Sequence, residues 1–366
     1  MSSAIAPSLL RGSAHLARWT LAGGAAVHAP PAWRLQLRWQ ACWFDRLWRQ
    51  QTARITAARP ADDPVLVLGL WRSGTTLLHD RLAALPGLQA PLTWQCFNPS
   101  SFMLTGAPGG PPAAAVRRPM DGGSIGVHSA QEDEFALLLL GAPSLYRGFV
   151  DPRRLPALAD EMLGPEAADA RADGSSAWAT DWLRFLAGVA AQGGGARLVL
   201  KSPNHTLRLA ALRQWLPGSP QVWIGRPLPE VWHSNLRMWR AMFAQYALWP
   251  CPPGVLEAFL ARCIERYLTT LTHALDHQPA HLVCWVDFSD LTLHPGESLL
   301  ALARFLGLPA QAGADDPSPA IVQRHPAQQA TTPPTPLPVG LAAAHEAVER
   351  LHERARMQWG WRARQC

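Results

Sequence analysis

Four short runs of apolar residues constrain the fold of this 366-residue chain more than any other feature. They are PVLVLGL (64–70), RLVLKS (197–202), QVWIGR (221–226) and HLVCWVDF (281–288). Each has the length and the β-branched content of a strand that is buried on both faces. Such strands need a covering layer above and below them, so the runs predict a central sheet and exclude an all-helical fold.

Helical patterns separate these runs. Apolar residues recur at helical spacing in five segments: 76–85, 178–191, 205–216, 228–247 and 254–277. Alternation of buried strands with helices indicates a mostly parallel sheet with helices on both faces. We therefore predict a three-layer α/β domain over residues 60–310, interrupted by a long Gly- and Pro-rich loop at 103–124.

Two further segments flank this domain. Residues 1–59 form an N-terminal extension with a Trp- and Arg-rich amphipathic helix at 31–56, and residues 311–366 contain a Pro-rich loop (311–338) and a helix at 339–358. A basic, Trp-rich helix can lie on a membrane surface. We expect instead that it packs on its own domain or on a partner subunit, and that the C-terminal helix packs on the domain. The roles of the 31–56 helix and of the loop stay open.

Composition narrows the class of protein. The formal charge is +6, but Lys201 is the only lysine among 33 basic residues, and no basic run marks a nucleic-acid site. The longest apolar stretches, such as 135–140, are too short to span a membrane. The six cysteines show no CxxC spacing, so we expect no metal site and reduced thiols. These features indicate a soluble, cytoplasmic protein without a nucleic-acid partner.

The segment that follows the first run carries the chemistry. Residues 69–76 read GLWRSGTT, between a predicted strand and a predicted helix. Glycines at 69 and 74 allow a tight turn whose N–H groups converge on an anion, and the helix N-terminus adds partial positive charge. A kinase or an ATPase would carry a lysine where this chain has Thr75, and the basic residue here is Arg72, inside the loop. The loop therefore indicates a site for one 5′-phosphate with a group attached, rather than for a triphosphate.

The motifs resemble those of sulfotransferases that use 3′-phosphoadenosine-5′-phosphosulfate (PAPS). GLWRSGTTLLHDRL is similar to their 5′-phosphosulfate loop, in the RSGTT form of the bacterial branch and of tyrosylprotein sulfotransferases. QVWIGRPLPEVWHSNLRM resembles their second motif, in which an Arg at a strand end and a Ser eight residues later, here Arg226 and Ser234, bind the 3′-phosphate. Two further blocks, LVLKSPNHTLRLAALRQWLPG and WVDFSDLTLHPGESLLALARFLGLP, occur in the family's order, so the resemblance covers about residues 64–310.

The resemblance implies a P-loop NTPase-like fold and an enzyme that moves a sulfuryl group from PAPS to a hydroxyl or an amine, without a metal. The residues that it implies for donor binding are Arg72, Ser73, Gly74, Thr75 and Thr76 for the 5′-phosphosulfate, and Arg226 and Ser234 for the 3′-phosphate. The acceptor stays open as a small molecule, a lipid or a carbohydrate. The oligomeric state is not predicted.

Sulfuryl transfer needs cations beside the leaving phosphate and a base for the proton of the acceptor. Arg72 and Lys201 can neutralise the leaving phosphate, and the compact ammonium of Lys201 suits an oxyanion. The acceptor needs a base, but Gln95 stands where related enzymes have a Glu, and an amide cannot take a proton. We therefore assign the base to His128, whose type titrates near neutrality, with Glu132 as the alternative.

Other classes of function stay open at this point. The absent lysine argues against a P-loop kinase-like enzyme. Gln95 leaves room for a non-catalytic nucleotide-binding or scaffold protein. Trp94, Phe97 and Phe102 follow the loop and suit an apolar or aromatic acceptor, although such rings equally suit a protein core.

Overall fold

The computed structural model describes residues 31–109, 116–117, 124–164, 177–309 and 337–361. A five-stranded parallel sheet of order β2–β5–β1–β6–β7 lies at its centre. Its strands are β1 (Val65–Leu68), β2 (Leu88–Gln89), β5 (Arg197–Lys201), β6 (Gln221–Gly225) and β7 (Val283–Asp287). The predicted parallel α/β fold is therefore confirmed.

Side chains of the central strand alternate between two buried clusters. Val65 and Val67 belong to the smaller cluster, and Leu66 and Leu68 to the larger one. This alternation with a period of two explains why the strand is apolar throughout, because both of its faces are covered.

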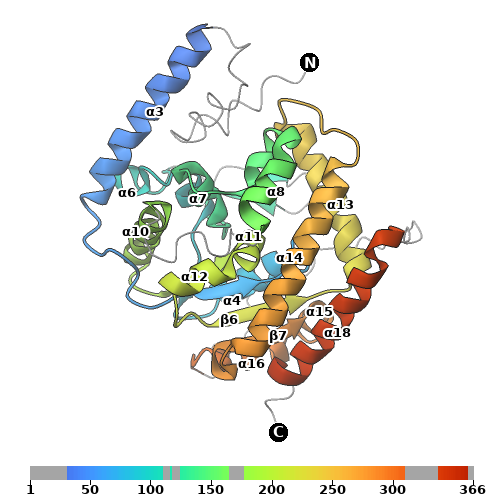
Figure 1. Cartoon of the computed structure of the whole chain (residues 1–366). Coiled ribbons are helices and arrows are strands. Elements are labelled where there is room, and N and C mark those ends of the chain that lie inside the picture. Colours follow the sequence, from blue (N-terminus) through green and yellow to red (C-terminus); the bar gives the residue numbers. More distant parts are fainter. Residues whose placement is uncertain (1–30, 110–115, 118–123, 165–176, 310–336, 362–366) are drawn as a thin grey trace.

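Helices cover both faces of the sheet (Figure 1). The smaller cluster includes side chains of α4 (Thr75–Ala83), α15 (Phe288–Leu293) and α16 (Pro295–Phe305). The larger cluster includes side chains of α5 (Thr93–Phe97), α6 (Phe102–Thr105), α7 (Glu134–Leu140), α8 (Leu155–Leu163), α10 (Ala177–Gln192), α11 (Pro203–Leu207), α12 (Leu209–Trp215), α13 (Leu228–Tyr246), α14 (Val255–His277) and α18 (Ala342–Trp359). Short 3-10 helices occupy Leu145–Phe149, Pro152–Arg154, Ala280–Leu282 and Val339–Leu341.

One predicted helix is divided. The segment 205–216 forms α11 and α12, which are separated at Arg208, where φ is −117° and ψ is 22°. The Arg208 guanidinium bonds to the Pro143 carbonyl at 2.9 Å and pairs with buried Glu134. The prediction of a single helix was therefore wrong. The break lies at a residue with tertiary contacts, and the periodicity of apolar residues does not reveal such contacts.

Three short strands were not predicted. The edge strand β2 has two residues, too few for a periodic pattern. A two-stranded antiparallel sheet of β3 (Val116–Arg117) and β4 (Ser124–Ile125) falls within the predicted 103–124 loop. Predicted strand residues 281–282 belong instead to a 3-10 turn before β7.

The two flanking helices lie outside the sheet. Helix α3 (Pro31–Thr52) is attached by its C-terminal half: the Trp48 indole donates to Asp181 at 3.2 Å, and buried Gln51 donates to the Pro99 carbonyl at 2.5 Å. Helix α18 packs on α14 and β7. Residues 1–30 and 310–336 lie outside the described ranges, so the division of the chain at residues 59 and 310 stays a prediction. No helix in the described part of the chain has the length and apolarity to cross a membrane.

The contact between α18 and the sheet contains a buried imidazole. His352 is 3% exposed, its Nε2 lies 2.9 Å from the hydroxyl of Tyr267, and its ring centroid lies 4.9 Å from that of Trp285. Burial, with a smaller contribution from Arg356, lowers the pKa of His352 to about 3. The folded protein therefore holds His352 neutral under conditions that protonate it in the unfolded chain.

Acid should destabilise the fold through His352. Between pH 6.5 and about 3 the unfolded state binds a proton that the folded state excludes, so this residue removes roughly 1.4 kcal/mol of stability per pH unit as the pH falls. In His352→Gln the loss of unfolding free energy between pH 6.5 and 4.5 should be smaller by about 2–3 kcal/mol than in the wild type. Urea denaturation followed by circular dichroism measures it. The exposed His281→Gln variant is the control, and the same reduction in both variants would contradict the assignment.

Candidate functional site

The loop between β1 and α4 has a main-chain conformation that glycine permits. Gly69 has a φ of 154° and Gly74 a φ of 106°. A Cβ on Gly74 would lie 2.4 Å from the ring of Phe288, and one on Gly69 would lie 2.7 Å from the Ser73 hydroxyl. Neither position accepts a side chain without displacing its neighbours. Arg72 has a φ of 70°, the one positive value of a non-glycine residue within the described ranges.

A threonine of α11 fixes the start of this loop. The Thr206 hydroxyl accepts from the Gly69 N–H at 2.8 Å and donates to the Gly69 carbonyl at 3.1 Å. Both polar groups of the glycine are thereby satisfied inside the protein. The loop is therefore held in place by α11, which directly follows Lys201 and Ser202 in the chain.

The first turn of α4 offers main-chain donors to an anion. Gly74 is its N-cap and provides no side chain to cap the first N–H groups, which an α-helix leaves without intrahelical acceptors. The Ser73 N–H and hydroxyl instead bond to the Leu70 carbonyl, at 3.2 and 2.8 Å. We expect the N–H groups of Ser73, Gly74, Thr75 and Thr76 to bind a 5′-phosphosulfate. The N–H group of Ser73 is thus already bonded within the loop.

The residues expected at a 3′-phosphate gather around Arg72. Its Nε donates to the Ser234 hydroxyl at 3.0 Å, and Arg226 donates to the Arg72 carbonyl at 3.2 Å. Arg226 also pairs with Glu230 at 2.6 Å and lies 4.4 Å from the ring centroid of Phe288. Two motifs that lie more than 150 residues apart in the chain therefore meet at one place.

Lys201 is brought to the same end of the sheet by strand pairing. It is the last residue of β5, and it lies opposite Val67 in the parallel register with β1. Its side chain is 4% exposed, donates to a carboxylate oxygen of Glu132, and lies 3.3 Å from the Thr76 hydroxyl on α4. An ammonium that is this well buried needs partners of this kind.

A short hydrogen-bonded chain holds Glu132 from its other side. The Tyr146 hydroxyl donates to Glu132 at 2.5 Å and accepts from the Trp71 indole at 3.0 Å. Burial, together with the charge of Glu132, raises the pKa of Tyr146 well above its usual value, so the phenol stays protonated and remains a donor. Glu132 is therefore oriented by Lys201 on one oxygen and by Tyr146 on the other.

The structure places His128 apart from these contacts. It is exposed in a turn closed by a 2.9 Å bond from the Gly126 N–H to the Ser129 hydroxyl. The adjacent Val127 carbonyl accepts from the Trp94 N–H at 3.0 Å, which ties the turn to α5. Of the two residues considered as a base, Glu132 contacts Lys201. In the described part of the chain no contact between His128 and Lys201 is present.

Gln95 has a structural role. Its side chain is buried, accepts from the Leu92 N–H at 2.8 Å at the start of α5, and donates to Gln192 of α10 at 2.9 Å. This amide thus joins two helices.

Aromatic rings continue from Glu132 in a connected series, which we call the aromatic wall: Phe97, Phe135, Tyr146, Phe149 and Trp239. Their successive ring centroids lie 5.0, 5.4, 4.8 and 4.5 Å apart. Phe97 and Phe135 are partly exposed.

The other two rings considered for an acceptor, Trp94 and Phe102, are buried in the core. Sequence reasoning missed the roles of Tyr146, Trp71 and Thr206. No motif covers Tyr146, and the motifs that contain Trp71 and Thr206 do not indicate a contact for either residue.

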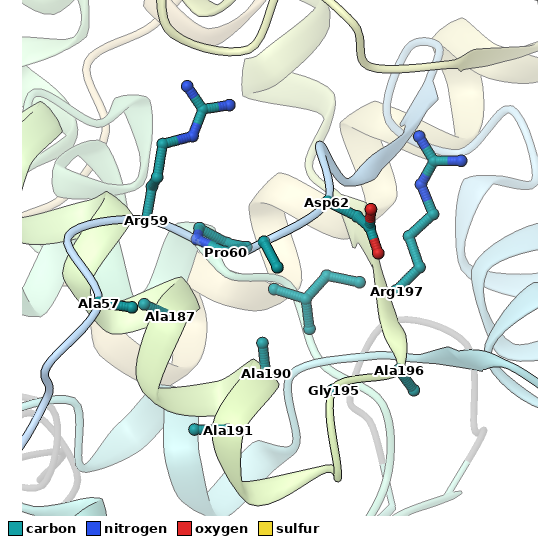
Figure 2. A pocket seen from close by; sticks show the side chains of 12 residues that line it. Ala57, Arg59, Pro60, Asp62, Ala187, Ala190, Ala191, Gly195, Ala196 and Arg197 are labelled. Atoms are coloured by element: carbon teal, nitrogen blue, oxygen red, sulfur yellow. The ribbon is translucent and has the colours of Figure 1, made fainter.

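A pocket lined mostly by small side chains lies elsewhere (Figure 2). Its lining includes Pro60, Asp62, Ala187, Ala190 and Arg197. These residues lie at or near the amino ends of β1 and β5, whereas the loop and Lys201 lie at the carboxyl ends. The pocket is therefore separate from the candidate site. Within the described ranges no group of three or more His, Cys, Asp or Glu side chains could hold a metal ion.

Comparisons with known proteins agree with this geometry. A model of the sulfotransferase family matches residues 64–312. The omega-hydroxy-beta-dihydromenaquinone-9 sulfotransferase Stf3 of Mycobacterium bovis, like that of Mycobacterium tuberculosis, is 30% identical over 232 residues, which are 63% of this chain and 57% of the relative. The match thus spans a little over half the length of these relatives.

Solved structures show the same fold. Sulfotransferase STF1 from Mycobacterium tuberculosis has a TM-score of 0.52 at 17% identity, covering 93% of this chain and 92% of that one. Sulfotransferase STF9 from Mycobacterium avium has a TM-score of 0.55 at 15% identity, covering 85% and 80%.

The family model extends from the strand before the glycine loop to the end of the last predicted block, well over half of the chain. The resemblance inferred from the four motifs is confirmed. The chain belongs to the sulfotransferase family.

Proposed function

We propose that this protein transfers a sulfuryl group from PAPS to a hydroxyl or an amine of an apolar acceptor. One observation carries the proposal: Arg72, Lys201 and Glu132 are placed around the start of α4 by three separate segments of the chain. Two cations beside an anion-binding helix start, with a carboxylate in contact, are what sulfuryl transfer requires.

The residues present fit the donor. Gly74 leaves the start of α4 without a side chain or a cap, as a phosphosulfate site needs. We assign the 5′-phosphosulfate to the N–H groups of Gly74, Thr75 and Thr76, with the side chains of Arg72 and Lys201, and the 3′-phosphate to Arg226 and Ser234. Ser73 shapes the loop through its bonds to Leu70. When bound, PAPS supplies the sulfuryl group and a phosphate leaving group.

We assign the base to Glu132 in place of His128. Its carboxylate contacts Lys201 and is held by Tyr146, so it lies beside the cation that faces the leaving group. In this proposal Lys201 turns to the phosphosulfate, which frees one Glu132 oxygen to take the proton of the acceptor while Tyr146 keeps hold of the other. The alternative with His128 needs movement of an exposed turn toward the site.

The aromatic wall supports an apolar acceptor. Phe97 and Phe135 give a ring surface that begins next to the partner of Glu132, and aromatic surfaces bind apolar ligands. The name of the Stf3 relatives gives their acceptor as a hydroxylated menaquinone. We propose for this chain the wider class of a lipid or another apolar molecule that carries a hydroxyl.

The rival functions are less well supported. A kinase-like enzyme would need a lysine where Thr75 stands. The non-catalytic alternative rested on Gln95, which cannot act as a base, and Glu132 supplies a carboxylate instead.

A cytoplasmic location agrees with the five cysteines of the described residues, Cys42, Cys96, Cys251, Cys263 and Cys284, which form no disulfide among themselves. Calorimetry with 3′-phosphoadenosine-5′-phosphate and with ATP, then turnover of labelled PAPS over a panel of hydroxyl and amine acceptors, tests the whole proposal.

Changing the proposed base gives a direct test of the chemistry. Glu132→Gln keeps the shape of the side chain but cannot accept a proton, so kcat should fall by about 10²–10⁴. Affinity for 3′-phosphoadenosine-5′-phosphate should stay within about threefold, because the amide oxygen can still accept from Lys201 or Tyr146. His128→Asn is the comparison and should turn over like the wild type. The reverse pattern would return the role of base to His128.

The phenol of Tyr146 should tune the base. Tyr146→Phe removes a hydrogen bond that favours the charged form of the Glu132 carboxylate, so the acid limb of the kcat profile should move to higher pH. At neutral pH kcat should fall roughly 10- to 100-fold, the value of a hydrogen bond to a charged group. Tyr246→Phe is the matched control. A lower kcat with an unmoved pH profile would mean that Tyr146 only supports the structure.

Binding of the 3′-phosphate can be isolated by comparing ligands. Arg226→Ala should weaken binding of 3′-phosphoadenosine-5′-phosphate by about 1.5–3 kcal/mol, because a charge-assisted hydrogen bond is lost. The loss should be smaller for adenosine 5′-phosphosulfate, which has no 3′-phosphate. Arg240→Ala, on the exposed side of α13, is the control. Equal losses for both ligands would place Arg226 elsewhere in the site.

A further inference from the structure

One face of helix α3 exposes large apolar side chains. Leu35, Trp39 and Trp43 are spaced four residues apart, so they form one stripe, and they are 69%, 66% and 46% exposed. The rings of Trp39 and Trp43 are stacked, with centroids 5.9 Å apart and planes within 4°. Figure 1 shows the amino-terminal part of α3 extending away from the layers around the sheet.

The same face is basic. Arg46 lies seven residues after Trp39 and therefore on the same side of the helix, with Arg38 and Arg49 at its edge; all three arginines are exposed. The helix contains a single acidic residue, Asp45. We call Leu35, Arg38, Trp39, Trp43, Arg46 and Arg49 the α3 face.

We infer that the α3 face docks on the surface of an anionic lipid membrane. Indole rings favour the boundary between headgroups and acyl chains, and arginines beside them reach anionic headgroups. The C-terminal half of α3 packs on its own domain, as expected from sequence, and the membrane is proposed as the occupant of the exposed face.

Charge argues against a second copy of the chain as the occupant. A twofold interface would bring the α3 face against itself, so that Arg38, Arg46 and Arg49 would meet the same three arginines. Asp45, seven residues after Arg38, is the one acidic residue of α3 beside this face, and one carboxylate on each copy does not balance three arginines. An anionic lipid surface complements the arginines and also accepts the rings.

The inference rests on the proposed apolar acceptor and connects to its site. Gln51, near the end of α3, donates to the Pro99 carbonyl and accepts from the Met103 N–H at 2.8 Å. Pro99 lies two residues after α5, whose last residue, Phe97, belongs to the aromatic wall, and Met103 lies in α6. Docking through α3 would hold this side of the molecule near the bilayer, so that a hydroxylated lipid could reach Glu132 along the wall.

Vesicle flotation with the full chain tests the inference. We expect binding to vesicles of equimolar phosphatidylglycerol and phosphatidylcholine that is at least tenfold stronger than binding to phosphatidylcholine alone. Trp39→Ala with Trp43→Ala should weaken it at least tenfold, while Leu293→Ala with Met357→Ala, an equally exposed apolar pair elsewhere, should leave it unchanged. Equal binding to both vesicle types, or equal losses in both double variants, would overturn the inference.

A charge-matched pair tests the arginines. Arg38→Gln with Arg46→Gln should reduce binding to the anionic vesicles about 30-fold, at roughly fivefold for each arginine near the surface. Arg240→Gln with Arg350→Gln makes the same change in net charge at exposed positions outside α3, and it should have little effect. Equal reductions would mean that net charge alone drives binding.

Two further measurements separate the remaining outcomes. Light scattering that shows a dimer of the wild type, lost in the Trp39 and Trp43 variant, would overturn membrane docking in favour of a second copy. Calorimetry with 3′-phosphoadenosine-5′-phosphate should give the same affinity for this variant and the wild type, because α3 lies outside the donor site. If neither binds that nucleotide while vesicle binding behaves as expected, the proposed function fails and the docking stands.

Discussion

The parallel pairing of β1 with β5 and β6 is the constraint on which the site depends. Parallel strands end at the same edge of a sheet, so the glycine loop after β1, Lys201 at the end of β5 and Arg226 after β6 meet although long segments separate them in the chain. The buried clusters hold β1 between its neighbours, because its side chains pack into one cluster on each face of the sheet. The core and the site are thus specified by the same strand contacts.

The pair of Lys201 and Glu132 is the most consequential contact within the site. Two buried charges are stable only as partners, and here the partners are the cation proposed for the leaving group and the carboxylate proposed as base. In the proposed mechanism an incoming phosphosulfate competes for the lysine, and this competition would couple donor binding to release of the base. Tyr146 keeps the carboxylate in place during the exchange, because burial and the charge of Glu132 keep its phenol protonated.

The surface features can be understood from the same site. The aromatic wall begins at Tyr146 and reaches Phe97, and the segment that follows Phe97 is tied through Gln51 to α3. The proposed apolar acceptor and the proposed membrane-facing helix α3 therefore involve connected parts of the structure. The pocket near Pro60 and Ala190, drawn in Figure 2, lies near the amino ends of β1 and β5, whereas the candidate site lies at the carboxyl ends.

The sequence by itself determined the parallel α/β fold and the position of the glycine loop, because these follow from local periodicity and from short motifs. The contacts of Arg72 with Arg226 and Ser234 come from strand pairing in the tertiary structure. Tertiary structure alone decided which acid or base reaches Lys201. Residue type favours His128 over Glu132, which follows four residues later, but a turn bonded to α5 exposes the first, and the Tyr146 phenol holds the second. It also decided that Gln95 joins two helices and that α11 and α12 separate at Arg208. Such outcomes depend on contacts between distant segments, which neither periodicity nor residue type encodes.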